Sequence, residues 1–328
     1  MIGARTRLLT AAIVTLVLAA GCGRDQAFAQ AKALVALKVG TLKQSALTDV
    51  WVAKQAGIFE RNGLDVELIE FRSGNEAIAA QRGGHVDIVL SIPGTAMTAN
   101  ERGFDLVLIA QNETAKSVGP DSGALIVLDG AGIDSVSDLA AKKIAISNLH
   151  SQYHVAVQTV LKQHGVDPAK VTFLELPFAS QPDALKSKQI DAAASLDPWT
   201  TQLRNSGYAK ILSWDYVESI PEQPIGAWYA QAPFVQKNPD TVARFAAAIR
   251  DAIEYMNQDA DRARRNVAAY TGLDPSITRE MPLINWSYRI APAKWQAVAD
   301  MMHASGELQN AHKASEYLSD IVTPYVLK

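Results

Sequence analysis

The chain has 328 residues, of which 48% are hydrophobic and 20% are charged. These are values of a globular protein, and the length is sufficient for two domains of ordinary size. The 31 basic and 34 acidic residues give a formal net charge of −3. This balance excludes the basic excess that nucleic-acid binding normally requires, so we expect no nucleic-acid partner.

The first 21 residues are typical of a secretory signal peptide. Arg5 and Arg7 precede an uncharged, mostly apolar run at residues 8–21, which is shorter than the ~20 residues that span a bilayer. We therefore expect residues 1–21 to be removed. The mature protein would lie outside the cytoplasm, in the periplasm or at the cell surface.

The end of this segment carries the only cysteine of the chain. Residues 18–22, Leu-Ala-Ala-Gly-Cys, resemble the lipobox of bacterial lipoproteins, which implies that Cys22 is lipidated after cleavage. Residues 22–36 would then be a tether, and the lipid would be the only attachment to a membrane. Cleavage after Ala29 is the alternative, because Ala27 and Ala29 have the small-x-small spacing of a signal-peptidase site.

The first half of the remaining chain alternates short apolar runs with helix-forming segments. Such runs, bounded by polar residues, glycine or proline, are typical of strands buried in a parallel sheet. The strands that we expect cover residues 37–42, 65–71, 86–90 and 105–111. Helices are expected after residue 45, at residues 73–83 and at residues 95–102.

The second half repeats this order of elements. Strands are expected at residues 143–147, 171–176, 190–195 and 209–214, with helices at residues 150–163, 180–188 and 198–205. The sequence separation between Val39 and Leu106 equals that between Ile144 and Ile211. Two halves of equal length and equal order predict a doubled α/β unit with two parallel-sheet lobes.

The segments that join the halves predict two crossings between the lobes. Residues 112–123 are polar and contain Gly119 and Pro120, which suits a connector. A further strand is expected at residues 124–128, and another at residues 225–231 leads the chain back to the first lobe. Two crossings favour hinge closure.

A helical C-terminal segment completes the prediction. Its helices are expected at residues 241–256, 262–270 and 294–303. We expect lobe I to comprise residues 37–118 and 231–328, and lobe II to comprise residues 119–230.

Four motifs, in this order, resemble those of solute-binding proteins of ABC transporters, of the nitrate/sulfonate/taurine (NMT1/THI5-like) type. They lie at residues 54–66, 84–88, 138–146 and 197–199. The chain departs from the pattern at Ala141, where glycine is usual, and at Leu196, where an aromatic residue is usual. The resemblance implies a two-lobed type II periplasmic-binding-protein fold that closes on a ligand and delivers it to a membrane permease driven by a separate ATPase.

Polar residues follow several of the expected strands, where free main-chain N–H groups of a following helix can face a ligand. In the first half the candidate ligand-binding residues are Ser45, Thr48, Ser91, Gly94, Thr95, Gln111 and Asn112. In the second half they are His150, Ser151 and Asp197. Trp199 and Trp228 are added as aromatic residues that could wall an apolar cleft, and Tyr153 and Phe178 could do the same.

Each candidate also has a purely structural alternative. The serine, threonine and glycine residues could serve as turn and cap residues, and Asp197 could cap the helix that begins near Pro198. If Asp197 faces the ligand, it would pair with a cationic group. Trp199 and Trp228 would either line an apolar cleft or belong to the core. His150 and His154 have the spacing of two metal ligands, but no third ligand is suggested nearby, so we expect no metal and no cofactor.

The function that we expect is capture, without catalysis, of a small polar or anionic organic molecule, such as a sulfonate or nitrate, by a monomer. The alternative is an enzyme of the same fold acting on a pyrimidine-like substrate. The sequence has no Gly-x-Ser-x-Gly, P-loop or Cys-x-x-Cys motif to favour an enzyme. It also has no later apolar run long enough for a receptor's membrane span.

Overall fold

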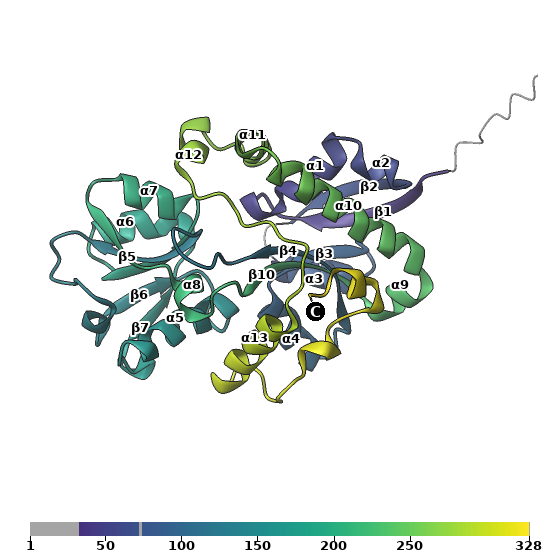
Figure 1. Cartoon of the computed structure of the whole chain (residues 1–328). Coiled ribbons are helices and arrows are strands. Elements are labelled where there is room, and N and C mark those ends of the chain that lie inside the picture. Colours follow the sequence, from purple (N-terminus) through teal and green to yellow (C-terminus); the bar gives the residue numbers. More distant parts are fainter. Residues whose placement is uncertain (1–32, 72–73, 328) are drawn as a thin grey trace, which may run out of the picture. The chain divides into compact units, whose positions relative to one another are not determined.

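The computed structural model describes residues 33–71 and 74–327, and its strands form two five-stranded sheets (Figure 1). The predicted signal peptide and Cys22 lie outside the described residues. The first sheet has the order β2-β1-β3-β10-β4. Its strands are β1 (Val35–Thr41), β2 (Leu64–Glu70), β3 (Ile88–Ser91), β4 (Leu106–Thr114) and β10 (Pro224–Gln231). We call this sheet and the helices packed on it lobe I.

The second sheet has the corresponding order β7-β6-β8-β5-β9. Its strands are β5 (Gly123–Leu128), β6 (Lys143–Ile146), β7 (Thr172–Glu175), β8 (Ala192–Leu196) and β9 (Ala209–Ser213). We call this sheet and its helices lobe II. The doubled α/β unit is therefore present, and each predicted strand overlaps an observed one.

Both sheets are mixed rather than purely parallel, which corrects the prediction. β1 pairs in parallel with β2 and β3, but β10 lies antiparallel between β3 and β4. In lobe II, β5 lies antiparallel between β8 and β9. In each sheet the inserted strand lies beside a connection between the lobes, so its direction is set by the crossing rather than by a helical β-α-β connection.

The crossings also correct two predicted boundaries. Residues 112–114 belong to β4, so the first crossing covers residues 115–122. β10 belongs to the sheet of lobe I, so residues 224–230 lie there and not in lobe II. The second crossing thus runs between β9 and β10.

The helices cover both faces of each sheet (Figure 1). Those of lobe I are α1 (Thr48–Gln55), α2 (Ile58–Arg61), α3 (Gly74–Arg82), α4 (Pro93–Glu101), α9 (Ala232–Lys237), α10 (Pro239–Asn257), α11 (Ala260–Thr271), α12 (Pro275–Glu280) and α13 (Pro292–Ala304). Those of lobe II are α5 (Gln152–Gln163), α6 (Gln181–Lys186), α7 (Trp199–Asn205) and α8 (Asp215–Ser219). A 3₁₀ helix, η1 (Ser45–Leu47), leads into α1.

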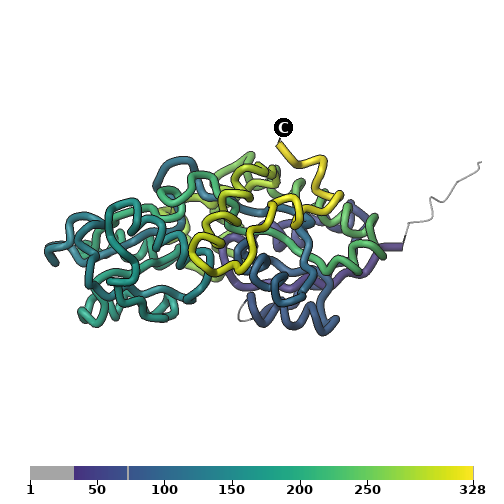
Figure 2. The backbone as a smooth tube through the Cα atoms, turned by 90° about the horizontal axis from the view of Figure 1, so that it is seen from below, coloured from purple at the N-terminus to yellow at the C-terminus, as the bar shows by residue number. Residues whose placement is uncertain are grey.

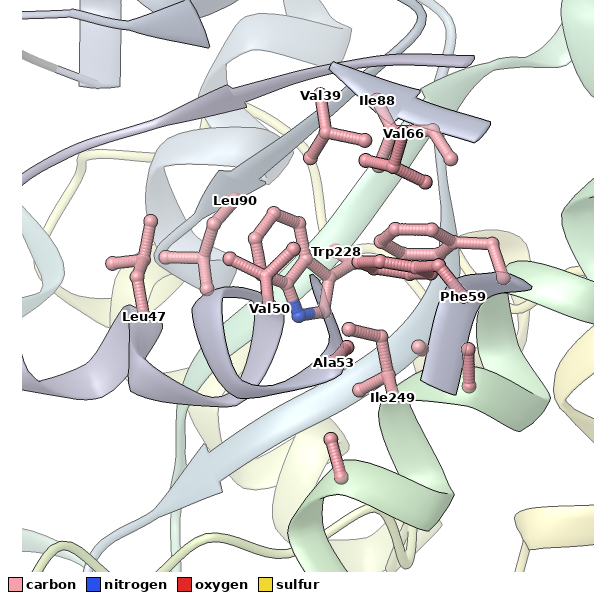
Figure 3. Close-up of a cluster of buried hydrophobic side chains, with 14 of the residues drawn as sticks. Val39, Leu47, Val50, Ala53, Phe59, Val66, Ile88, Leu90, Trp228 and Ile249 are labelled. Carbon is pink, nitrogen blue, oxygen red and sulfur yellow. The ribbon is translucent and has the colours of Figure 1, made fainter. Parts of the chain in front are cut away.

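The core of lobe I forms where the apolar stripe of α10 meets the sheet and α1. Trp228 of β10 lies in its centre, near Phe59 (Figure 3). Trp228 is in edge-to-face contact with Phe245 of α10, and Phe245 stacks on Phe59. All four residues of β3 are buried, as expected for a strand covered by helices on both faces. Each large apolar side chain that is fully buried stabilises the fold by about 1.5–3 kcal/mol.

The last residues of the described chain, yellow in Figure 2, also pack on lobe I, where they contact β4. The Leu108 main-chain N–H donates to the Tyr317 carbonyl, and Leu108 and Leu318 form a parallel bridge. Ile290 pairs in the same way with Val326. This segment and α13 are therefore part of lobe I, and the two lobes together form one compact unit, residues 34–328.

Candidate functional site

The predicted site residues lie at corners where a parallel strand passes to a helix. In lobe I the corners are β1–α1 and β3–α4, and in lobe II they are β6–α5 and β8–α7. β1 is the neighbour of β3, and β6 is the neighbour of β8, each pair in parallel. Both corners of a lobe therefore lie at the same edge of its sheet, the carboxyl-end edge at which α/β sheets bind ligands.

The β3–α4 corner of lobe I directly contacts the first turn of α5 in lobe II. The Gly94 main-chain N–H donates to Gln152 Oε1 at 2.8 Å. Gln152 is fully buried, and its Nε2 donates to Gln223 Oε1 at 3.0 Å and to the Pro224 carbonyl at 2.9 Å. A Cβ atom at Gly94 would approach the Gln152 Cβ to 3.0 Å. The N–H group predicted to face a ligand is thus already bonded to the other lobe.

A second contact between the lobes involves His150. Its Nδ1 lies 2.8 Å from Glu307 Oε1, and its side chain is 75% exposed. Ser151 is the N-cap of α5: its hydroxyl accepts from the His154 main-chain N–H and donates to the Asn148 carbonyl. Ser151 is therefore a helix-capping residue, as its structural alternative predicted. The imidazole of His150 lies at the surface where the lobes meet.

At the β8–α7 corner, only one of the two carboxylate oxygens of Asp197 has a hydrogen-bond partner. Asp197 Oδ1 accepts a hydrogen bond from the Thr201 main-chain N–H at 2.9 Å. Asp197 Oδ2 is buried and has no hydrogen-bond partner. Burial raises the pKa of Asp197 to about 6. Beside this carboxylate, Trp199 stacks on Phe178 with ring centroids 5.9 Å apart, and both rings are partly exposed.

The first crossing brings further charged groups to this corner. Lys116 is partly exposed, and its Nζ donates to the Pro120 carbonyl at 3.0 Å. Burial lowers the pKa of Lys116, and the carboxylates of Asp121 and Asp197 oppose that shift. Arg264 of α11 lies near enough to lower it further. Sequence patterns gave no signal for these residues, because they lie in a connector and on an amphipathic helix.

Buried acids also surround the crossings. Glu113 is 5% exposed, and burial raises its pKa to about 8, with Asp121 and Asp49 adding to the shift. Burial likewise raises the pKa of Asp215 to about 8, although the Tyr153 hydroxyl donates to it at 2.9 Å. Tyr153 is therefore a core residue bound to this acid.

Three predicted binding residues of lobe I have structural roles instead. Trp228 is fully buried within the hydrophobic cluster (Figure 3). Its Nε1 donates to Asp49 Oδ2 at 3.1 Å. Gln111 accepts from Trp295 Nε1 at 2.8 Å and donates to the carbonyls of two residues of the segment before α13. The Thr48 hydroxyl donates to the Ser45 carbonyl at 2.7 Å, which closes the turn before α1.

The remaining candidates of lobe I are not fully committed to hydrogen bonds within the fold or are partly exposed. Asn112 Nδ2 donates to Asp49 Oδ2 at 2.7 Å and to the Ala46 carbonyl, but its buried Oδ1 has no partner. Ser91 is buried at the end of β3, and its hydroxyl donates to the adjacent Ile92 carbonyl at 3.3 Å. Ser45 is buried and Thr95 is partly exposed.

Three surface depressions, of about 730, 500 and 390 Å³, lie away from these corners. They lie between α11 and α12, between α5 and α13, and between α10 and residues 286–289. None of the twelve predicted binding residues lines them. Within the described part of the chain, no helix combines the length and the apolar character that crossing a membrane requires.

Relatives of known structure have the same fold. The alkanesulfonate-binding protein SsuA from Xanthomonas axonopodis pv. citri, solved bound to MOPS, matches with a TM-score of 0.71 and 21% identity. The match covers 90% of this chain and 99% of that chain. The predicted type II periplasmic-binding-protein fold, with two lobes and a helical C-terminal segment, is confirmed.

The relatives by sequence include binding proteins and synthases. A protein of Bacillus subtilis (strain 168), provisionally named as an aliphatic sulfonates-binding protein, is 24% identical over 82% of this chain and 80% of its own length. A 4-amino-5-hydroxymethyl-2-methylpyrimidine phosphate synthase of Saccharomyces cerevisiae is 22% identical over 71% of this chain and 68% of its own length. The family model described as NMT1/THI5 like matches residues 44–263, and the chain therefore belongs to the NMT1/THI5-like family.

Proposed function

We propose that this protein is an extracytoplasmic solute-binding protein that captures a small polar or anionic organic molecule by closure of its two lobes. A sulfonate, nitrate or a related compound is the expected ligand class. The protein would deliver this ligand to the permease of an ABC importer, which a separate ATPase drives. It would act as a monomer, without catalysis and without a cofactor, held to the membrane through a lipid on Cys22.

The observation that carries the proposal is the meeting of strand-end corners from the two lobes. Gly94 at the start of α4 is bonded to Gln152 at the start of α5, and His150 is paired with Glu307. A molecule held at these corners contacts both lobes, so it binds the closed arrangement better than an open one and shifts the population toward it. The sulfonate-binding relatives support the same ligand class.

We propose Ser45, Ser91, Thr95, His150, Asp197 and Trp199 as the residues that contact the ligand. The hydroxyl groups would donate to an anionic or polar group, together with main-chain N–H groups at the helix starts. The imidazole of His150 would donate a ring N–H to the same group. Asp197 and Trp199 would contact the remainder of the molecule.

The test is a ligand screen on the purified chain from Leu34 onward. Thermal unfolding and isothermal titration calorimetry are measured with alkanesulfonates, aminosulfonates, nitrate, aromatic acids and pyrimidines. Saturation with a true ligand at a hundred times its Kd raises the free energy of unfolding by about 2.7 kcal/mol. Small-angle scattering with the same compound is expected to show a smaller radius of gyration.

The second candidate function is an enzyme on a pyrimidine-like substrate, which the yeast relative favours. Each compound that binds is therefore also analysed by mass spectrometry after incubation. Recovery of the unchanged compound supports a binding protein, and conversion to a product supports the enzyme. No binding by any compound of the panel would refute the proposed ligand class. The anchor is tested separately with Cys22→Ser in the full chain, which is expected to leave the membrane fraction.

A further inference from the structure

We propose that the groove between α11 and α12 is a second binding site, which takes a small organic molecule with two or more negatively charged groups, such as carboxylates or phosphates. The groove lies in lobe I, and none of the twelve predicted binding residues lines it. The inference therefore concerns a site separate from the strand-end corners and does not depend on the proposed function.

The first argument is the size and the charge of the groove. Its volume is about 730 Å³, and its charged lining residues are three arginines and one aspartate, Arg264, Arg265, Arg279 and Asp261. Small-molecule sites typically measure about 300–1,000 Å³. The whole chain has more acidic than basic residues, 34 and 31. The groove is therefore a local concentration of positive charge on a slightly acidic protein.

The second argument is the way in which Arg264 is held. Its Nη1 donates to the Thr278 carbonyl at 2.5 Å and to the Met281 carbonyl at 2.7 Å. Among the described residues, no hydrogen bond uses its Nε or Nη2, and neither atom is buried. One edge of the guanidinium is thus fixed by the fold, and the other edge can bind a carboxylate or a phosphate through two parallel hydrogen bonds.

The other two arginines are also available to a ligand. Arg265 Nη2 lies 3.9 Å from Asp259 Oδ2, and both side chains are exposed, so this pair is weak. Within the described ranges, Arg279 is in no ion pair closer than 4.0 Å. Arg279 helps to lower the pKa of Asp274, but this carboxylate already caps α12 by accepting from the main-chain N–H and the hydroxyl of Ser276.

The third argument is that one wall of the groove is fixed from both lobes. The last carbonyl groups of a helix have no partner within the helix. In α12 and the residue after it, Arg264 binds the carbonyls of Thr278 and Met281, and Arg204 of lobe II donates to the Glu280 carbonyl at 2.7 Å. The end of α12 is therefore held by two arginines. A site on a wall held in this way binds with a smaller ordering cost.

The remaining lining residues indicate that the anion is organic. The groove also exposes apolar groups, from Ala268, Ala269, Leu273 and Pro275. An apolar carbon skeleton in contact with them would be removed from water, which favours binding. An inorganic anion would leave these groups unused. The groove thus fits a molecule that carries several acidic groups on an apolar body.

The experiment uses three probes that share one ring and differ in charge. They are benzoate, isophthalate and benzene-1,3,5-tricarboxylate, with one, two and three carboxylates. Binding to the purified protein is measured by isothermal titration calorimetry. Each further pair of exposed opposite charges strengthens binding by about 1.5- to 5-fold. We expect the tricarboxylate to bind about 5- to 25-fold more tightly than benzoate, and this advantage to shrink at high salt concentration.

The variants locate the binding site. Arg265→Gln/Arg279→Gln removes two exposed charges from the groove and leaves Arg264, which holds α12, in place. Arg102→Gln/Lys237→Gln is the matched control, because it removes two exposed positive charges of lobe I that do not line the groove. We expect the advantage of the tricarboxylate to vanish in the first variant and to persist in the control.

A further variant adds charge instead of removing it. Ala269 is exposed on α11 and lines the groove, so Ala269→Glu places a negative charge there and is also expected to abolish the advantage. Circular dichroism melts establish that the variants are folded, and the two groove variants act independently if one of them is not.

Three results would overturn the inference. The first is equal affinity for the three probes, or no binding of any of them. The second is an advantage of the tricarboxylate that persists in both groove variants, since the anion would then bind elsewhere. The third is binding of a hexaglutamate peptide that the groove variants abolish, without preferential binding of the tricarboxylate. The occupant would then be an acidic segment of a protein and not a small molecule.

Discussion

The substitution Glu113→Gln tests how the buried acids of the first crossing affect stability. The carboxyl of Glu113 is 5% exposed, and its pKa is about 8, compared with 4.5 for an ordinary glutamate. Between these values the folded chain holds a proton that the unfolded chain has released. The unfolded state therefore binds fewer protons, and stability falls as the pH rises through this window.

The size of the effect follows from the width of that window. From pH 5 to pH 7.5 the wild-type chain loses about 3 kcal/mol through this group alone, at about 1.4 kcal/mol per pH unit. Glutamine has nearly the same shape and is always neutral, so the free energy of unfolding of Glu113→Gln does not fall in this way as the pH rises. We expect the variant to gain about 3 kcal/mol relative to wild type between the two pH values.

The assay is urea unfolding of both proteins at pH 5 and pH 7.5, followed by circular dichroism. Other titrating groups, such as Asp215, are common to both proteins and cancel in the difference. Glu67→Gln is the matched control, because this glutamate is exposed on β2, and its stability difference from wild type is expected to stay constant. Parallel pH curves for Glu113→Gln and wild type would refute the reasoning.

Three further substitutions test contacts of the fold by the same unfolding measurements. Trp228→Phe replaces the buried indole with a smaller ring and removes the hydrogen bond to Asp49. We expect a loss of at least about 1–3 kcal/mol, from the lost bond and the cavity together; an unchanged stability would show that neither contributes. Gln152→Met leaves the Gly94 N–H unpaired between the lobes, and a loss of about 1–3 kcal/mol is expected, with no loss arguing against the contact. His312, whose pKa two neighbouring glutamates raise above 6.5, stabilises the fold below that ordinary value and ceases to do so as the pH rises through its folded-state pKa. The stability difference between wild type and His312→Gln should therefore shrink between pH 5.5 and pH 9, and a difference that grows would contradict this.

The sequence predicted the elements well, because each depends on local patterns. Short apolar runs bounded by polar residues located every strand, and the equal lengths of the halves predicted the doubled unit. The sequence predicted parallel sheets and gave no direction for the two inserted strands, β5 and β10, which are antiparallel to their neighbours. The apolar run that forms β10 does not indicate whether this strand pairs in a parallel or an antiparallel way. That depends on the direction in which the second crossing brings the chain into the sheet.

The site was predicted less completely, because proximity to a strand end does not fix what a side chain touches. Gln111 and Asp197 were both selected as polar residues at a strand end, and Trp228 was selected as an aromatic residue that could line a cleft. Trp228 is a core residue because α10 packs over it on the sheet. The amide oxygen of Gln111 is not free for a ligand because it accepts a hydrogen bond from the indole of Trp295. Gln152, which joins the lobes, had no sequence signal at all.

By itself the sequence determined the order of the elements, the two lobes and the corners at which polar residues gather, because hydrophobic period and turn residues act over a few neighbouring positions. The tertiary structure alone decided which polar groups are paired and which are not. Hydrogen bonds such as that from Gly94 to Gln152 join residues far apart in the chain. The unpaired oxygen of Asp197 was likewise visible only once everything around it had been packed.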